Sequence, residues 1–361
     1  MVMESMKHSG VSYDHDVDEI TGERRAGNTG RSVARKSLLT VLVLLLLMPA
    51  SGTIFQRLST YRESLKFPPP GRVLEVNGRA MHLDCAGSGG PTVVLESGLL
   101  HDSRDWLLVE PGVANFTRVC SYDRAGYGWS DYRSGVRGAA AISDELAALL
   151  AVGGEMPPFI LVGHSLGGIF ARQFALRHPG TVVGMVFVDS SHEQQLAHFS
   201  PPGNSIQRSQ HYFRKAFVAN EFGIPRLQHA CGRDAIRPDL EAEAVYLECR
   251  PTRWLTALHE IELFVSPPPM PARGMFGSMP IEVLTRDFDL EDDPADRAAR
   301  PIWIQLQKEL AALSLAGNWR VVKGASHAIH IDKPDEVVTA IRQVWNAARK
   351  SSLSSEASEH P

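Results

Sequence analysis

The chain has 361 residues, of which 43% are hydrophobic and 22% are charged, and its formal net charge at pH 7 is −4. A chain of this length and composition can bury a full core, and it carries no global basic field that would attract nucleic acid. We find no repeat period, and the sequence has no Cys-x-x-Cys pair that would support a zinc or redox motif. No cofactor is expected.

The N-terminal region predicts a membrane anchor. Residues 1–36 are polar and are expected to be cytoplasmic, whereas residues 37–58 form a transmembrane signal anchor or a signal peptide. Nineteen uncharged residues run from Ser37 to Phe55, which is about the length that crosses a bilayer as a helix. Basic residues precede this run at 24, 25, 31, 35 and 36. The positive-inside rule therefore predicts a membrane-anchored protein whose catalytic domain is extracytoplasmic.

Two alternatives to the anchor stay open. The small residues of "PASG" fit a cleaved signal peptide, which would leave a secreted protein. A buried core helix is a third interpretation, but leucines on every face of the run are hard to reconcile with one-sided packing.

A linker over residues 59–71 leads into the folded domain, and its three consecutive prolines favour an extended segment. Asn77-Gly78 between two apolar runs is a strong hairpin signal. The expected strands are 73–78, 80–85, 92–98, 118–122, 159–163, 182–189, 280–284 and 319–324, and the expected helices include 139–154, 167–179 and 335–348. Apolar strands separated by helices predict an α/β fold with a mostly parallel open sheet buried on both faces.

The strand and helix pattern breaks after residue 189. The expected core comprises residues 72–189 and 280–348, and residues 190–279 have helical patterns of their own. A stretch of this length is an inserted helical cap rather than a loop. Residues 349–361 are polar and are expected to be a disordered tail.

A Gly-x-Ser-x-Gly pentad lies between a predicted buried strand and a predicted helix. Its residues are Gly163, His164, Ser165, Leu166 and Gly167. Glycines on both sides of the serine allow the sharp turn that lifts a nucleophilic hydroxyl above the sheet, at the N-terminus of a helix. The alternative is a serine N-cap with packing glycines, which explains the serine but not the whole pattern.

A serine nucleophile needs a base and an acid. His327 follows the last predicted strand and is the expected base, with His330 as its competitor. The pair also has metal-ligand spacing, but no glutamate accompanies it on a helix, so no metal site is expected. Asp189 and Asp287, the latter with Asp289 beside it, both follow strands at the carboxyl edge of the sheet, so either could orient the histidine.

The oxyanion hole would consist of the backbone N–H of Leu166 and that of Leu99, in the loop after the strand at 92–98.

Four motifs, read together, resemble the α/β-hydrolase superfamily in its capped, esterase-like branch. They are "LESGLLHDSRDW", "SYDRAGYGWSD", "LVGHSLGGIFARQFALRHPGTVVGMVFVDSSHE" and "GASHAIHIDKPDEV", and together they span residues 72–347. The resemblance implies a nucleophile at Ser165, a base at His327 and oxyanion donors at Leu99 and Leu166. A serine at this position points to acyl transfer, since similar epoxide hydrolases and dehalogenases use aspartate.

The sequence departs from the family pattern at two places. Ser97-Gly98 stands where many members have His-Gly, and the strand before Asp287 lacks the common Gly-x-x-Asp turn. The second departure favours Asp189 as the triad acid, with Asp287 as the alternative.

The expected activity is therefore hydrolysis of a small-molecule carboxylic ester by a carboxylesterase- or lipase-like enzyme. The alternatives are hydrolysis of amides or peptides, or of carbon–carbon bonds, with the same triad. An aminopeptidase-like role would need a cap carboxylate, for which Glu241, Glu243 and Glu248 are candidates. A non-catalytic binding protein is a further alternative. The expected partners are the ester and, through the N-terminal helix, a membrane; nucleic acid is not expected, and the oligomeric state stays open.

The four cysteines fit an oxidising compartment, where they allow three pairings, but four small buried side chains are an equally good interpretation. They are Cys85, Cys120, Cys231 and Cys249.

Overall fold

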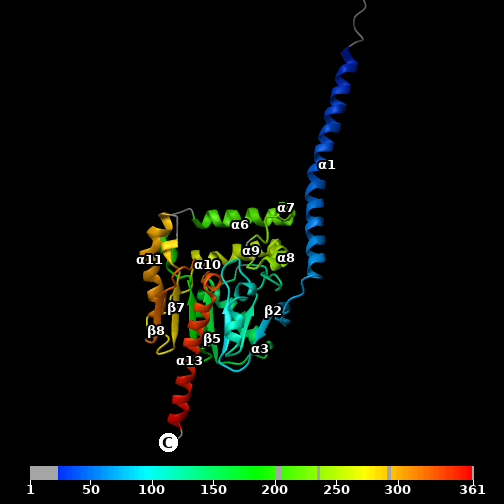
Figure 1. Ribbon diagram of the computed structural model, residues 1–361. Coiled ribbons are helices and arrows are strands. Elements are labelled where there is room, and N and C mark those ends of the chain that lie inside the picture. The colour runs from blue at the N-terminus through cyan, green and yellow to red at the C-terminus, as the bar shows by residue number, and fades with distance from the viewer. Residues whose placement is uncertain (1–22, 136, 200–204, 234–235, 291–293, 360–361) are drawn as a thin grey trace, which may run out of the picture. The chain divides into compact units, whose positions relative to one another are not determined.

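The computed structural model of the chain describes residues 23–135, 137–199, 205–233, 236–290 and 294–359 (Figure 1). The chain divides into two compact units, Met1–Ser51 and Gly52–Pro361. Residues 1–22, which belong to the predicted cytoplasmic segment, lie outside the described residues.

The first described element is the long helix α1, Glu23–Ser64, which contains the predicted membrane segment 37–58 and includes Pro49. Among the residues that the structure describes, none of the helices combines the length and apolar character that a bilayer span requires. The side chains at 42 and 44–46 lie outside the described residues.

The C-terminal turns of α1 belong to the second unit and contact cap residues. Gln56 is buried and donates through Nε2 to the backbone oxygen of Cys249 at 2.8 Å. Glu63 forms an ion pair with Arg226. Gln56 of the predicted span is thus packed against the cap, whereas Ile54, Phe55 and Leu58 beside it are exposed. The helix continues to Ser64, within the predicted linker, where Glu63 has its partner.

Eight strands form one sheet in the order β1-β2-β4-β3-β5-β6-β7-β8. Their bounds are β1 Arg72–Val76, β2 Arg79–Ala86, β3 Thr92–Glu96, β4 Val119–Tyr122, β5 Phe159–His164, β6 Val182–Val188, β7 Ile281–Thr285 and β8 Gly317–Val321. The pairs β1/β2 and β2/β4 are antiparallel and the remaining pairs are parallel. Asn77 and Gly78 both have positive φ at the β1–β2 turn, as a tight hairpin requires. The predicted α/β fold with a mostly parallel sheet is confirmed.

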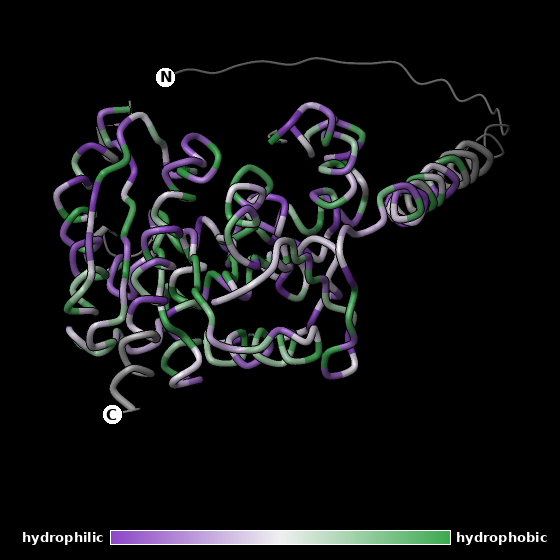
Figure 2. Tube along the Cα trace, turned by 60° about the horizontal axis from the view of Figure 1, so that its bottom comes forward, coloured by the Kyte–Doolittle hydropathy of each residue, from purple (hydrophilic) through white to green (hydrophobic). Residues whose placement is uncertain are grey.

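Helices cover both faces of the sheet. The core helices are α2 Glu110–Ala114, α3 Ala139–Val152, α4 Gly167–Arg177, α11 Pro294–Ala311, α12 Ile329–Asp332 and α13 Pro334–Glu359, and the short α5 Gln195–Phe199 lies in the segment expected to be the cap. One buried cluster joins the sheet to α3, α4 and α11, and a second joins its other face to α2 and α13. Figure 2 shows hydrophobic and hydrophilic residues interspersed along the helical parts of the chain, as is typical of helices that pack on one side.

The helix α13 continues to Glu359, so the predicted disordered tail is helical up to that residue. The segment contains neither glycine nor proline before Pro361, and nothing in it forces the helix to end earlier.

The segment between β6 and β7 holds the cap helices, which lie together over the sheet in Figure 1. They are α6 Ser205–Glu221, α7 Ile224–Leu227, α8 Glu241–Glu248, α9 Pro251–Glu260 and α10 Glu262–Val265. Phe213 of α6 packs against Ala257 of α9 and against Ile261 in one buried cluster.

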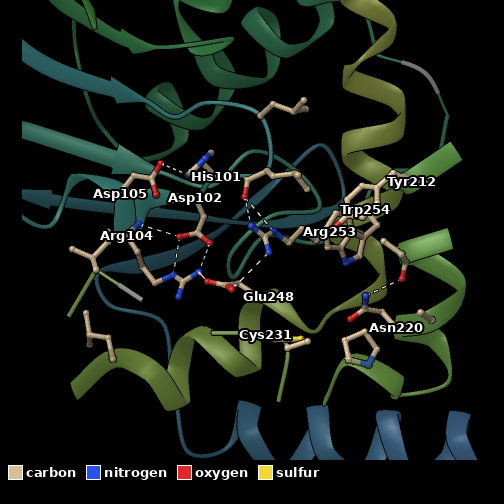
Figure 3. Close-up of a pocket in the computed structure, with 18 of the residues that line it drawn as sticks. His101, Asp102, Arg104, Asp105, Tyr212, Asn220, Cys231, Glu248, Arg253 and Trp254 are labelled. Carbon is tan, nitrogen blue, oxygen red and sulfur yellow. Dashed lines mark hydrogen bonds and ion pairs between the residues drawn. The ribbon is translucent and has the colours of Figure 1, made fainter. Parts of the chain in front are cut away.

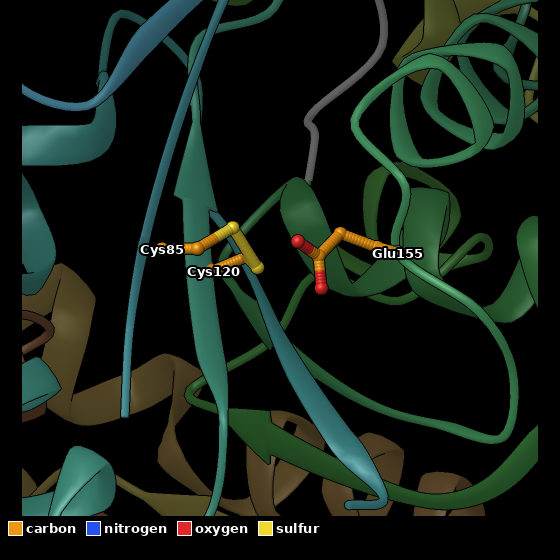
Figure 4. Close-up of side chains that lie close together, drawn as sticks. All are labelled: Cys85, Cys120 and Glu155. Atoms are coloured by element: carbon orange, nitrogen blue, oxygen red, sulfur yellow. A yellow bond between two sulfur atoms is a disulfide. The ribbon is translucent and has the colours of Figure 1, made fainter. Parts of the chain in front are cut away.

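The four cysteines form two disulfides. Cys85 and Cys120 are joined across the paired strands β2 and β4, and Cys231 is joined to Cys249 within the cap. Glu155 lies near the first disulfide (Figure 4), but these two sulfurs are bonded to each other and provide no thiolate for a metal ion.

Candidate active site

Ser165 occupies a strained turn between β5 and α4. Its φ is +50°, a left-handed conformation that costs a non-glycine residue of order 1–3 kcal/mol and is concentrated at functional sites. The turn is anchored on both sides, because Ser165 donates its N–H to Val188 at 3.2 Å and its carbonyl accepts from Ser191 N at 2.8 Å. The N-cap residue of α4 is Leu166, so the interpretation of Ser165 as a helix N-cap is wrong.

Close backbone contacts explain the two glycines of the pentad. A Cβ on Gly163 would lie 2.6 Å from the Cα of Gly168, and a Cβ on Gly167 would lie 2.4 Å from the backbone oxygen of Glu96. Side chains at these two positions would force β3, β5 and α4 apart. The glycines therefore let the serine turn sit directly against the end of β3.

His327 and Asp189 lie side by side at the carboxyl edge of the sheet. Asp189 follows β6, His327 follows β8, and the His327 Nδ1 is 2.6 Å from the Asp189 Oδ2. The Asp189 carboxylate is fully buried, while the His327 side chain is 42% exposed. The other carboxylate oxygen accepts from Trp303 Nε1 at 2.8 Å and from Arg286 N at 3.2 Å. These bonds hold the carboxylate facing the imidazole.

Asp287, the alternative acid, has other partners. Its carboxylate accepts from Gly324 N at 3.0 Å and from Lys323 Nζ at 3.2 Å, so it braces the turn after β8. The backbone N–H of Gly324 lowers the pKa of the Asp287 carboxyl. Asp289 shares Lys323 and also pairs with Arg300.

His330, the alternative base, is buried away from Asp189. Its ring packs 5.0 Å from that of Trp106 and 4.3 Å from that of His164, between ring centroids. Burial lowers its pKa. Asp105, His164 and His330 bring potential metal-ligand atoms within 4.8 Å of one another, but Asp105 is already paired with His101 at 2.7 Å.

The loop that follows β3, residues 97–100, contains the predicted oxyanion donor Leu99 and lies beside Ser165; it is called the oxyanion loop below. A Cβ on Gly98 would be 3.2 Å from the Cβ of Ser165. Leu100 has a φ of +66°, which shows how sharply the loop turns. Leu99 therefore lies on the loop that faces the serine turn, and Leu166 lies within the turn itself.

Sequence reasoning missed the side chains that support this loop. Arg124, in the predicted motif "SYDRAGYG", is buried and pairs with Glu96 at 2.7 Å and with Glu260 at 2.9 Å. Burial raises the pKa of the Glu96 carboxyl to about 7. The motif gave a signal for Arg124, whereas no local pattern connects it to Glu260 in the cap.

A cavity of about 680 Å³ lies between the cap and the oxyanion loop (Figure 3). Leu99, Leu100 and Trp254 contribute to its apolar lining. Of the three cap carboxylates considered from the sequence, Glu248 lines the cavity, where it accepts from Gly232 N at 2.9 Å and lies 3.7 Å from Arg104.

The model of the alpha/beta hydrolase family matches residues 93–340. The uncharacterized protein YqjL of Bacillus subtilis is 26% identical over 274 residues, which are 76% of this chain and 91% of that protein. An uncharacterized protein of Schizosaccharomyces pombe is 26% identical over 72% of this chain and 52% of its own length, so the chain spans about half of that relative.

Solved structures share the fold at lower identity. An esterase from Thermogutta terrifontis is 18% identical with a TM-score of 0.54, and the match covers 77% of this chain and 98% of the esterase. The enol-lactonase from Burkholderia xenovorans is 17% identical with a TM-score of 0.56, over 76% of this chain and 99% of that protein. At such identities the likeness concerns the fold alone.

Proposed function

Because this chain belongs to the alpha/beta hydrolase family, and is thus a hydrolase of that kind, we propose that it cleaves carboxylic esters by acyl transfer to Ser165. The single observation that carries the proposal is the 2.6 Å contact between His327 and Asp189, at the sheet edge where the strained Ser165 turn also lies. A serine, a buried carboxylate and a histidine in this order along the chain form the set that acyl transfer needs.

In the proposed reaction, the Ser165 hydroxyl attacks the ester carbonyl while His327 accepts the hydroxyl proton. The Asp189 carboxylate stabilises the imidazolium that forms and holds its orientation. The N–H groups of Leu99 and Leu166 stabilise the oxyanion of the tetrahedral intermediate. His327 then returns the proton to the leaving alcohol, and a water molecule activated by His327 hydrolyses the acyl-enzyme.

The cavity under the cap favours an ester over a substrate with a free amine. Leu99, Leu100 and Trp254 give the cavity apolar surface that suits an acyl chain or a hydrophobic alcohol, and charged residues such as Asp102 and Arg253 line it as well. Its connection to the proposed catalytic residues is through Leu99, since Ser165 and His327 are not among the lining residues. Glu248, the carboxylate that could hold an amine, already has Arg104 and Gly232 as partners.

We further propose that the catalytic unit works outside the cytoplasm, because both disulfides of the described chain are of the kind that persists in oxidising compartments. Attachment to a membrane through residues 37–58 stays a prediction from the sequence. Cell fractionation of the full chain, followed by thiol labelling of the intact and the denatured protein, tests both points. A cytosolic protein whose cysteines are labelled as free thiols would contradict the proposal that the catalytic unit works outside the cytoplasm.

A fluorophosphonate probe tests the proposed nucleophile. The wild type should be labelled once, and Ser165→Ala should lose both the label and the hydrolysis of p-nitrophenyl esters. Ser143→Ala is the matched control, because the Ser143 hydroxyl is buried in α3 and bonds to Ala139. A folded wild type that takes no label, or a labelled Ser165→Ala variant, would refute the proposal. A series of acyl-chain lengths then defines the preferred ester.

A further inference from the structure

The cap helix α9 contacts the oxyanion loop from both of its ends. Arg253, in its first turn, donates to the Leu100 carbonyl through Nε at 3.2 Å and through Nη2 at 2.6 Å (Figure 3). Glu260, its last residue, accepts two bonds of 2.9 Å from the Arg124 guanidinium. One cap helix thus reaches the loop directly at one end and through Arg124 at the other.

Arg124 links Glu260 rigidly to the oxyanion loop because all the N–H donors of its guanidinium are hydrogen-bonded. A guanidinium has five N–H groups, and two of them bond to Glu260. The other three bond to Glu96 Oε1, to the Ser97 carbonyl and to the Gly98 carbonyl, each at 2.7 Å. With its side chain 2% exposed, the guanidinium is held in one position and holds two successive loop carbonyls with it.

Because of the geometry of the peptide unit, the hydrogen bond from Arg124 to the Gly98 carbonyl also fixes the direction of the oxyanion donor, the Leu99 N–H. The Gly98 carbonyl and the Leu99 N–H belong to the same trans peptide, so they point in opposite directions. Because the carbonyl is bonded to Arg124, the N–H points away from Arg124. Gly98 itself lies against Ser165, so the contact on its carbonyl governs a donor beside the nucleophile.

Tyr127 adds a second connection between Glu260 and the loop. Its hydroxyl accepts from the Leu100 N–H at 3.4 Å and donates to the Glu260 Oε2 at 3.1 Å. Both peptides that flank Leu99 are therefore tied, through Arg124 or through Tyr127, to the same carboxylate.

The position of Glu260 is unfavourable for the helix that carries it. An anion in the last turn of a helix opposes the macrodipole, and this side chain is only 2% exposed. Its stabilisation comes from Arg124 and Tyr127, which belong to the core rather than to the cap. The Glu260 carboxylate thus stabilises the arrangement of Arg124, Tyr127 and the oxyanion loop rather than the helix α9.

We propose that Glu260 is a positioning residue for the oxyanion hole: it fixes Arg124 and Tyr127, and they orient the Leu99 N–H toward the reacting carbonyl. The inference rests on the proposed esterase function. It also means that the oxyanion hole is complete only when α9 of the cap is in place.

The test compares Glu260→Gln with wild type on a p-nitrophenyl ester. A glutamine keeps the shape of the side chain but removes the charge that holds Arg124. Loss of a whole oxyanion donor costs about 10²–10³-fold in kcat, so a displaced donor should cost about 10- to 100-fold. KM should stay within about twofold of wild type, because the ester ground state makes little use of this donor.

Binding of an alkyl boronic acid separates positioning from general damage. Its tetrahedral serine adduct places an oxygen in the oxyanion hole, so its Kd should rise by the same factor as kcat falls. Binding of the product alcohol should not change. Glu262→Gln is the matched control, because Glu262 lies two residues further on and its carboxylate bonds to Gln210 instead.

A second variant covers the case in which Glu260→Gln does not fold. Tyr127→Phe removes one hydroxyl and should lower kcat several-fold, with weaker boronate binding and unchanged KM. Wild-type kcat and boronate affinity in either folded variant would overturn the inference. A wild type that hydrolyses no ester would instead overturn the proposed function, so the two failures are distinguishable.

Discussion

Asp189→Asn should abolish most of the turnover while leaving the protein folded. An asparagine can keep its Oδ1 as the acceptor for Trp303 Nε1 and Arg286 N, which now bond there at 2.8 and 3.2 Å. Its amide nitrogen would then face His327 Nδ1. Because an amide nitrogen only donates, the His327 Nδ1 would have to be the acceptor, which places the ring proton on Nε2. An Nε2 that already carries a proton cannot take one from Ser165.

The magnitude follows from the charge that is lost. In the wild type an imidazolium forms beside a fully buried carboxylate whose oxygen is 2.6 Å from Nδ1. Two unit charges about 4 Å apart attract by about 4 kcal/mol at an effective dielectric constant of about 20. This corresponds to about 10³-fold in rate, and the wrong tautomer adds to it, so we expect a loss of about 10³–10⁴-fold in kcat.

Initial rates on a p-nitrophenyl ester measure this loss, and circular dichroism verifies the fold. Asp287→Asn is the matched control, since Asp287 braces the turn at Lys323 and Gly324 instead of the imidazole. It should stay within about threefold of wild type in kcat, as expected for a change outside the reacting groups. A larger loss in Asp287→Asn than in Asp189→Asn would show that the assignment of the acid is wrong.

Three further predictions concern stability and packing. Burial raises the pKa of the Glu96 carboxyl from 4.5 to about 7, so the folded state loses stability, by at most about 3 kcal/mol, as the pH rises through this window. Glu96→Gln should make the free energy of unfolding, measured with urea between about pH 5 and about pH 8, depend less steeply on pH. An unchanged pH dependence would contradict the raised pKa of Glu96. Replacing Cys231 and Cys249 by serine opens a loop of 18 residues and should lower the free energy of unfolding by about 3 kcal/mol in equilibrium denaturation. Gly167→Ala should abolish ester hydrolysis, because its Cβ would lie 2.4 Å from the Glu96 oxygen, whereas Gly138→Ala meets open space and should be active.

The fold was predictable because its signals are local. Continuous apolar strands, the Asn77-Gly78 turn and the pentad around Ser165 each specify a conformation within a few residues. His327 was predictable for a similar reason, since it follows a strand that the pattern identifies. The departure at Asp287 from the common turn favoured Asp189, and the structure places Asp189 against His327.

What could not be predicted depends on residues that are distant in sequence. Glu260 reaches Arg124 across 136 positions, and no periodicity in either segment specifies that contact. The pairing of the four cysteines was likewise open, because it depends on which strands are neighbours in the sheet. The sequence predicted three separate segments, 1–36, 37–58 and 59–71, where the structure has the single helix α1 across parts of all three. The polar contact of Gln56 with the cap has no signature in the sequence.

The attachment of the cap to the core limits how the cap can be exchanged. The first residues after Asp189 belong to the serine turn as much as to the insertion, because Ser191 N bonds to the Ser165 carbonyl at 2.8 Å. Arg172 of α4 holds the same stretch, through the Ser191 carbonyl at 2.8 Å and through Glu193 at 2.9 Å. A chimera that takes its cap from a relative should therefore be joined after Glu193. The cap is a replaceable module only beyond that residue.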